Sequence, residues 1–315
     1  MDQAITWWNI NRALYSQTDR LSTFTFLAQK LYTWGENGFG ELGLGDTTDR
    51  SSPVQVGAVG TWSNIGSGVN NNVAITSTGN LFSWGRNNQG QLGLGDITAR
   101  SSPVQVGALT TWASVAAGSS FSLGVTTGGT LFAWGRNDLG QLGLGDITAR
   151  SSPVQVGALT TWASVAAGGY HSLAVTTGNT LFAWGYNNVG QLGLGDTTAR
   201  SSPVQVGVLT TWSTVAGGQY HSLGIMTTGT LFAWGKNTSG QLGLGDTTAR
   251  STPTAVGALS TWATLSLGDS FSLGVTTGGT LFAWGLNTSG QLGLGDTTAR
   301  SSPVQVGALT TWASV

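Results

Sequence analysis

The stretch WGRNDLGQLGLGD, residues 134–146, decides the fold of this chain because versions of it return every fifty residues. A leucine stands three residues before the tryptophan that opens each version, at positions 31, 81, 131, 181, 231 and 281. All six prolines and twelve of the 14 tryptophans keep the same spacing. A chain of 315 residues has room for two domains of about 150 residues each, but an unbroken repeat predicts a single one.

Each repeat predicts four short strands joined by turns. In the third repeat these segments are residues 131–134, 153–156, 162–166 and 172–176. The second begins with a proline, where a missing N–H does least harm to a strand, and Gly178-Asn179 is a tight-turn signal. Four strands in every ~50 residues without helices are typical of a β-propeller. We therefore predict an all-β propeller of four-stranded blades, with six blades preferred.

The two ends of the repeat array predict how the ring closes. Val315 holds the same position in its repeat as Val165, so the final repeat is incomplete. Residues 16–30 hold the repeat positions that are missing after Val315, so they could supply the rest. Leu21-Ser22 is in phase with His171-Ser172. We expect an N-terminal strand to complete the last blade, which removes exposed strand edges. On this reading residues 16–315 form one propeller domain and residues 1–15 lie outside it.

Composition disfavours several classes of protein. Charged residues make up 8% of the chain and the net charge is −1, which argues against binding nucleic acid through its phosphates. The absence of cysteine excludes disulfides and thiolate chemistry. No run of 18 apolar residues predicts a membrane-spanning helix, and the first residues lack the pattern of a secretory signal. We expect a cytoplasmic or virion-associated protein that does not insert into membranes.

The motifs that could carry chemistry have simpler structural explanations. Residues 38–43 match G-x-G-x-x-G, but the strand and helix that a dinucleotide site needs are not predicted around them. The recurring Gly-Leu-Gly-Asp supplies one carboxylate per blade, too few for calcium, and Asp146 is expected to bind turn amides and to pair with Arg150. His171 and His221 have no nucleophile or second base nearby in sequence. We therefore expect no enzyme activity, no metal and no cofactor.

The repeated loop and the segment GGYHSL, residues 168–173, resemble the repeat of the regulator of chromosome condensation family. The resemblance covers residues 31–315 and recurs six times. It implies a β-propeller, which in the best-known members closes with seven blades. It also implies binding of other macromolecules across one face of the propeller. The members include a nucleotide exchange factor for a small GTPase, a plant ultraviolet-B photoreceptor and a bacterial β-lactamase inhibitor. The Gly-Trp-Arg-His-Thr motif of the photoreceptor is absent here.

Differences between the repeats gather in a few loop positions. Repeats 81–130 and 131–180 differ at 8 of 50 positions, and five of these fall in the pair after the loop asparagine and the triplet before the serine. The residue after Trp-Gly also varies. Tyrosine and arginine are frequent anchors of interfaces, and in related propellers these windows lie toward one end of the ring. The candidate partner-binding residues are Arg86, Phe121, Arg136, Tyr170, His171, Tyr186, Tyr220, His221, Lys236 and Phe271. The alternative is drift at loops that the fold does not constrain.

The segment before the repeats is a second candidate contact region. It contains Trp7 and Trp8, followed by Ile10, Leu14 and Tyr15. A segment this short is not a stable helix by itself, so it must pack on something. It packs beneath the propeller, or it docks onto another protein or a second copy of the chain; the sequence leaves both open.

Three functions follow from these patterns. The leading expectation is a non-enzymatic protein–protein interaction module that uses one propeller face. The second is a structural component of a larger assembly, such as a virion or a surface appendage, which near-identical repeats and scarce charge would suit. The third is a guanine-nucleotide exchange factor for a small GTPase, weakened by the lack of insertions between repeats. The sequence does not name the partner.

Overall fold

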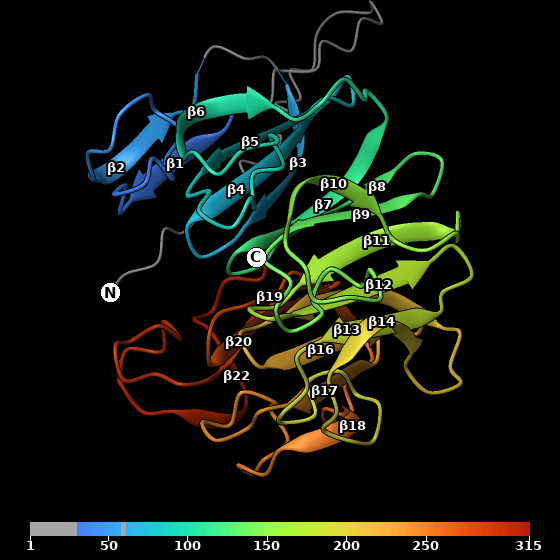
Figure 1. Ribbon diagram of the computed structural model, residues 1–315. Helices are drawn as coiled ribbons and strands as arrows, with labels where there is room; N and C mark the ends of the chain where they lie inside the picture. Colours follow the sequence, from blue (N-terminus) through green and yellow to red (C-terminus); the bar gives the residue numbers. More distant parts are fainter. Residues whose placement is uncertain (1–29, 58–60) are drawn as a thin grey trace, which may run out of the picture.

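The computed structural model describes residues 30–57 and 61–315, and every regular element in them is a β-strand. The strands form five antiparallel sheets of four strands and one sheet of two strands. Figure 1 shows these sheets following one another around a common centre in the order of the sequence. The prediction of an all-β propeller built from four-stranded blades is confirmed.

The strand bounds repeat with the fifty-residue period. The two-stranded sheet contains β1 (Tyr32–Gly35) and β2 (Arg50–Gln55). The next two blades contain β3 (Trp62–Ser67), β4 (Asn71–Thr76), β5 (Leu81–Gly85) and β6 (Arg100–Gln105), then β7 (Trp112–Ala117), β8 (Phe121–Thr126), β9 (Leu131–Gly135) and β10 (Arg150–Gln155). The remaining blades contain β11 (Trp162–Ala167), β12 (His171–Thr176), β13 (Leu181–Gly185) and β14 (Arg200–Gln205), then β15 (Trp212–Gly217), β16 (His221–Met226), β17 (Leu231–Gly235) and β18 (Arg250–Ala255), and finally β19 (Trp262–Leu267), β20 (Phe271–Thr276), β21 (Leu281–Gly285) and β22 (Arg300–Gln305).

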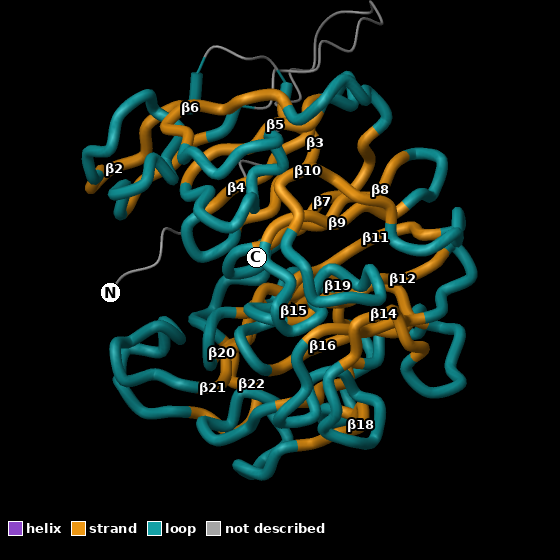
Figure 2. Tube along the Cα trace, viewed as in Figure 1, coloured by secondary structure: helices purple, strands orange, loops and turns teal. Residues whose placement is uncertain are grey.

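Strand direction gives the propeller two distinct ends. The first strands of neighbouring blades, such as β7 and β11, contact one another and lie innermost. The turn after the first strand (118–120 in the second blade) and the long loop after the third strand (136–149) share one end, which we call the mouth face. The turn after the second strand (127–130) and the crossing to the next blade (156–161) share the other end, the far face. Figure 2 shows these loops at the strand ends.

Tryptophans hold adjacent blades together. Trp134 on β9 is fully buried, and its Nε1 donates a hydrogen bond to the carbonyl oxygen of Gln91 in the preceding blade at 3.0 Å. Trp112 on β7 meets Trp134 edge-on, with ring centroids 6.0 Å apart. This geometry is favourable for aromatic pairs. The same tryptophan pair recurs in every four-stranded blade, edge-on or tilted, so the two tryptophan series form the core within and between blades.

The junction between the last blade and the two-stranded sheet differs from the others. The predicted closing strand falls in residues 16–29, which lie outside the described residues, as do Trp7, Trp8 and the proposed boundary after residue 15. Gly243 has the ring of Trp284 from the next blade against it, whereas the nearest neighbour of Gly293 is Val306 of its own blade. Trp34 holds the repeat position of the tryptophan that would cover Gly293 in a closed ring, and its side chain is partly exposed. This junction is therefore uncovered in the described part of the chain.

A glycine substitution reports whether this junction is covered in solution. We expect Gly293→Ala to lower the free energy of unfolding by only about 1–2 kcal/mol, the usual cost of a left-handed backbone for alanine. Its φ is 66° and no atom lies within ordinary clash distance. The measurement is urea denaturation beside Gly157→Ala, whose φ is 59° and which faces open space. A loss well above that of Gly157→Ala would show that a tryptophan covers Gly293, as closure of the ring requires.

Candidate functional site

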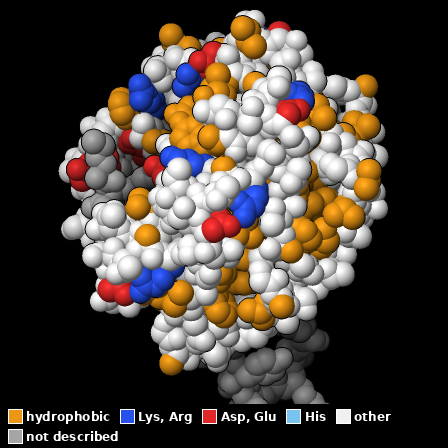
Figure 3. Space-filling view, turned by 90° about the horizontal axis from the view of Figure 1, so that it is seen from below, with side chains coloured by type: hydrophobic (Ala, Val, Ile, Leu, Met, Phe, Trp, Pro, Cys, Tyr) orange, Lys and Arg blue, Asp and Glu red, His pale blue; other side chains and the backbone are white. Residues whose placement is uncertain are grey.

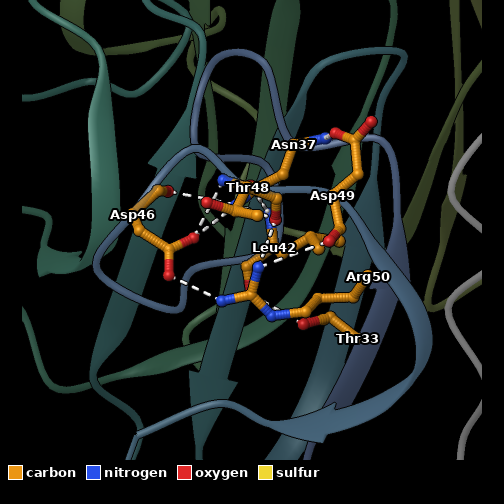
Figure 4. A network of polar contacts seen from close by, with 7 residues as sticks. All are labelled: Thr33, Asn37, Leu42, Asp46, Thr48, Asp49 and Arg50. Atoms are coloured by element: carbon orange, nitrogen blue, oxygen red, sulfur yellow. Dashed lines mark hydrogen bonds and ion pairs between the residues drawn. The ribbon is translucent and has the colours of Figure 1, made fainter.

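The long loops of the mouth face are held by a buried asparagine. Asn137 has no exposed surface, and its Nδ2 donates to the carbonyl oxygens of Asp146 and Thr148 and to Oδ1 of Asp146, at 3.0–3.1 Å. Its Oδ1 accepts from the amide of Leu142 at 2.9 Å. Figure 4 shows the same network around Asn37 in the first repeat. The loops are therefore a preformed platform rather than flexible connections.

The aspartate and arginine of each repeat complete this platform. Arg150 Nη2 lies 2.6 Å from Asp146 Oδ2, and the amide of Thr148 donates to Asp146 Oδ1. This amide and then the Arg150 guanidinium hold the pKa of Asp146 below its ordinary 3.8. Blue and red side chains lie side by side on the surface in Figure 3, as such pairs require. The structural explanation of the aspartate series, rather than a calcium ring, agrees with this geometry.

Backbone hydrogen bonds bring the variable windows together on the mouth face. The amide of Tyr186, the residue after Trp-Gly, donates to the carbonyl oxygen of Tyr170 in the triplet at 3.0 Å. The amide of Lys236 donates in the same way to Tyr220 at 2.9 Å. The equivalent bond recurs in the other four-stranded blades. Residues that vary between repeats are thus neighbours in space, as the resemblance implied.

Three tyrosines from two adjacent blades form one aromatic cluster. The rings of Tyr170 and Tyr220 are stacked, with centroids 5.5 Å apart and an interplanar angle of 26°. Tyr186 meets both edge-on at 6.4 and 6.3 Å. All three side chains are partly exposed. Burial raises the pKa of Tyr220 above its ordinary 10.0, and Tyr170 and Asp269 add to this shift, so the phenol of Tyr220 can donate a hydrogen bond at neutral pH.

Cations flank the tyrosines on both sides. The guanidinium carbon of Arg136 lies 5.7 Å from the ring centroid of Tyr170, and the ammonium nitrogen of Lys236 lies 5.5 Å from that of Tyr220. Such cation–π contacts are favourable and fix the position of long side chains. Arg136 also forms two bonds of 2.6 Å with the carboxylate of Asp138. We call the set Arg136, Tyr170, Tyr186, Tyr220 and Lys236 the tyrosine arc; it spans three consecutive blades.

A further aromatic–cation pair lies on the same face. The guanidinium carbon of Arg86 lies 4.8 Å from the ring centroid of Phe39, which is 44% exposed. Arg86 was among the residues predicted from sequence, and Phe39 was not. The sequence did carry a signal for it, because Phe39 occupies the variable pair after the loop asparagine and is the one aromatic residue at that position.

The mouth face has a small hollow at its centre. Turns from five blades enclose a cavity of about 90 Å³ at the centre of the mouth face, lined chiefly by glycines together with Ser119, Gln219 and Asp269. Pockets for small organic ligands usually have volumes of about 300–1,000 Å³. The mouth face therefore offers a broad aromatic and polar surface rather than a ligand pocket.

Three predicted contact residues are held between blades instead of standing free on the surface. Phe121, His171 and His221 have no exposed surface. His171 Nε2 is hydrogen-bonded to Ser222 Oγ of the next blade at 2.8 Å, and His221 Nε2 is 3.0 Å from Ser272 Oγ. The physical reason is that this position opens the second strand, whose side chains point into the blade interface. Phe271 occupies the same position and is partly exposed, at the uncovered junction.

The described residues contain no metal-binding arrangement. Residues 30–57 and 61–315 contain no group of three histidine or carboxylate side chains placed to hold a metal ion. Burial lowers the pKa of His171 to about 3, so this ring is neutral at physiological pH. Within the same ranges no helix is long and apolar enough to cross a membrane.

Comparison with known proteins assigns the chain to a family. The regulator of chromosome condensation (RCC1) repeat matches residues 30–75, 78–125, 128–175, 179–225, 228–275 and 278–315. A second form of the same repeat matches residues 62–91, 112–141, 162–191, 212–241 and 262–291. The matches cover most of the chain, so it belongs to the RCC1-repeat family of β-propellers. The resemblance stated from sequence is confirmed, and no curated protein matches the chain.

Solved structures agree with this fold. Human WBSCR16 superposes with a TM-score of 0.79 at 24% identity, covering 88% of this chain and 76% of that protein. Yeast RCC1 (Prp20), solved bound to Kap60, gives a TM-score of 0.79 at 22% identity, covering 90% and 72%. Prp20p from Saccharomyces cerevisiae gives 0.77 at 23% identity, covering 90% and 74%. At these identities the likeness establishes the fold and not the function.

Proposed function

We propose that this chain is a protein-interaction module that binds a protein partner through the tyrosine arc. The observation that carries the proposal is the cluster of Tyr170, Tyr186 and Tyr220 between Arg136 and Lys236, at positions where the repeats otherwise diverge. Tyrosine and arginine are enriched among residues that contribute most to binding. Their mutual contacts hold them in place before binding, which lowers the entropic cost of association.

The shape of the mouth face favours a macromolecular partner over a small molecule. A central hollow of about 90 Å³ holds little more than a few waters, whereas the arc offers partly exposed aromatic rings and charges across three blades. The yeast relative Prp20 was solved bound to Kap60, so a protein that contains this fold binds another protein. We also infer that the chain is not an enzyme, since its buried histidines have no route to a substrate.

The test removes the tyrosines and follows binding. The variant Tyr170→Ser/Tyr186→Ser/Tyr220→Ser is expected to fold, because Ser120 and Ser270 occupy the positions of two of these tyrosines in other repeats. We expect it to capture the partner from an extract of the native host at least about 30-fold less well than the parent chain, the loss typical of one strong contact residue.

The matched control changes exposed apolar residues outside the arc. Ile97 and Ile147 are each 66% exposed on mouth-face loops, and threonine stands at their position in other repeats. Ile97→Thr/Ile147→Thr should bind like the parent chain. If the tyrosine variant is folded and captures the same proteins in the same amounts, the proposal is wrong. Capture of a GDP-bound small GTPase followed by nucleotide release would identify the partner class as the one expected for an exchange factor.

A further inference from the structure

The far face of the propeller carries almost no charge. In the described ranges, every aspartate, glutamate, arginine and lysine except Lys30 lies in a mouth-face loop, in a mouth-face turn or at the mouth end of a fourth strand. The turns and blade crossings of the far face consist of threonine, serine, glycine, asparagine, alanine, valine and leucine, for example VGALTT at residues 156–161. The two ends of the molecule therefore differ completely in their electrostatics.

In the described residues, five successive segments of the far face each display one exposed leucine. These leucines occupy the same place in each repeat and are 44–62% exposed: Leu109, Leu159, Leu209, Leu259 and Leu309. Val208 beside one of them is 88% exposed. Single exposed leucines are ordinary on protein surfaces. Here they recur at one position of successive repeats, on a face that carries almost no charge.

Hydrogen bonds anchor both ends of the crossings that carry these leucines. In the crossing before β7, the carbonyl oxygen of Thr111 accepts from the amide of Thr127 at 2.7 Å. The amide of Trp112 donates to the carbonyl oxygen of Gly79 in the previous blade at 3.2 Å, and Gln105 Nε2 donates to Gly107 O at 3.2 Å. The backbone of the far face is thus already hydrogen-bonded, and its leucines are presented without a large ordering cost.

We propose that the far face is a self-association surface through which two copies of the chain pair face to face. An uncharged face meets its own copy without like-charge repulsion and without the cost of removing charges from water. A two-fold axis in the plane of the contact brings the same residues together from both copies, which is the usual symmetry of a homodimer. The leucines of one ring then lie between those of the other.

A second copy fits this face better than a different protein. The face presents nearly the same residues in every repeat, so it lacks the blade-to-blade differences by which a distinct partner is recognised. The tyrosine arc has those differences and lies at the opposite end. Pairing through the far face therefore leaves both mouth faces free, and it gives two arcs that face away from each other.

The test measures the solution mass of the full chain over a concentration series by analytical ultracentrifugation. We expect the parent chain to pass from about 32.3 kDa to twice that mass at micromolar concentration. Leu159→Asp/Leu209→Asp places unpaired charges in the contact and should raise the dissociation constant at least about 100-fold. Ile97→Asp/Ile147→Asp, with side chains 66% exposed on the mouth-face loops, is the matched control and should dimerise like the parent.

Three outcomes would overturn the proposal. The first is a parent chain that stays monomeric at every concentration. The second is a dimer that the leucine variant does not weaken while its melting temperature matches the parent, which would place the contact elsewhere, for example at Trp7 and Trp8. The third is a monomer whose far-face amides become exposed to hydrogen exchange only after residues 1–29 are removed. That result would show that residues 1–29, and not a second copy, cover the far face.

Discussion

Replacing Gly143 by alanine is expected to lower the free energy of unfolding by about 2–5 kcal/mol. The backbone there has φ of 72°, which costs alanine about 1–2 kcal/mol. The new Cβ would also lie 2.7 Å from Nε1 of Trp184 in the next blade, and overpacking of this kind costs about 1–3 kcal/mol. Trp184 has no room to retreat, because it is fully buried and its Nε1 is bonded to Gln141 O at 2.9 Å.

Gly157→Ala separates the clash from the backbone cost. Gly157 also has positive φ, at 59°, but a Cβ there meets nothing within 4 Å. Denaturation in urea should therefore give a loss of about 1–2 kcal/mol for Gly157→Ala and a clearly larger one for Gly143→Ala. Equal losses for the two variants would mean that Trp184 does not pack against this loop as the structure describes.

Mild acid is expected to destabilise the propeller through its two buried histidines. Burial lowers the pKa of His171 to about 3, and burial, with smaller electrostatic contributions from His171 and Lys236, lowers that of His221 to about 3. In the unfolded chain both return to about 6.5, so the unfolded state binds more protons between pH 6.5 and pH 3. Stability is therefore highest above pH 6.5 and falls as the pH drops, by about 2 kcal/mol per histidine at pH 5.

The chain supplies its own control for this prediction. Phe121 and Phe271 occupy the position of the histidines in two other blades, so His171→Phe/His221→Phe is expected to fold. Ser222 keeps a partner in the variant because its Oγ donates to Gln191 O at 2.8 Å. Between pH 7.5 and pH 5 the parent should lose about 4 kcal/mol more unfolding free energy than the variant. The same loss in both proteins would show that the histidines do not remain neutral in the folded state.

Much of the fold could be predicted from the sequence because the repeat fixes both composition and spacing. The strand predicted at residues 131–134 from its apolar residues is β9, Leu131–Gly135, the third strand of its blade. The strand predicted at residues 153–156 is β10, the fourth strand of this blade, but β10 starts at Arg150 and not at Pro153. The proline is accommodated inside the strand because the pairing of β10 with β9 shifts register between Arg150 and Val154.

The candidate site was predictable only in part. Differences between repeats correctly singled out Tyr170, Tyr186 and Tyr220 as neighbours at one end of the propeller, since variation is tolerated where side chains do not build the interior. The same criterion also selected His171, which varies between repeats yet is buried between blades. Variation alone does not separate these cases, because histidine and phenylalanine can fill the same space at the start of the second strand.

Photo-crosslinking from single positions tests most directly whether the mouth face is the partner-binding surface. A photoreactive phenylalanine analogue would replace Tyr186 in the tyrosine arc and, separately, Leu159 on the far face, and each protein would be irradiated in an extract of the native host. We predict that the label at Tyr186 becomes attached to a different protein, while the label at Leu159 becomes attached to a second copy of this chain. A different protein attached from Leu159 and none from Tyr186 would contradict the proposed function.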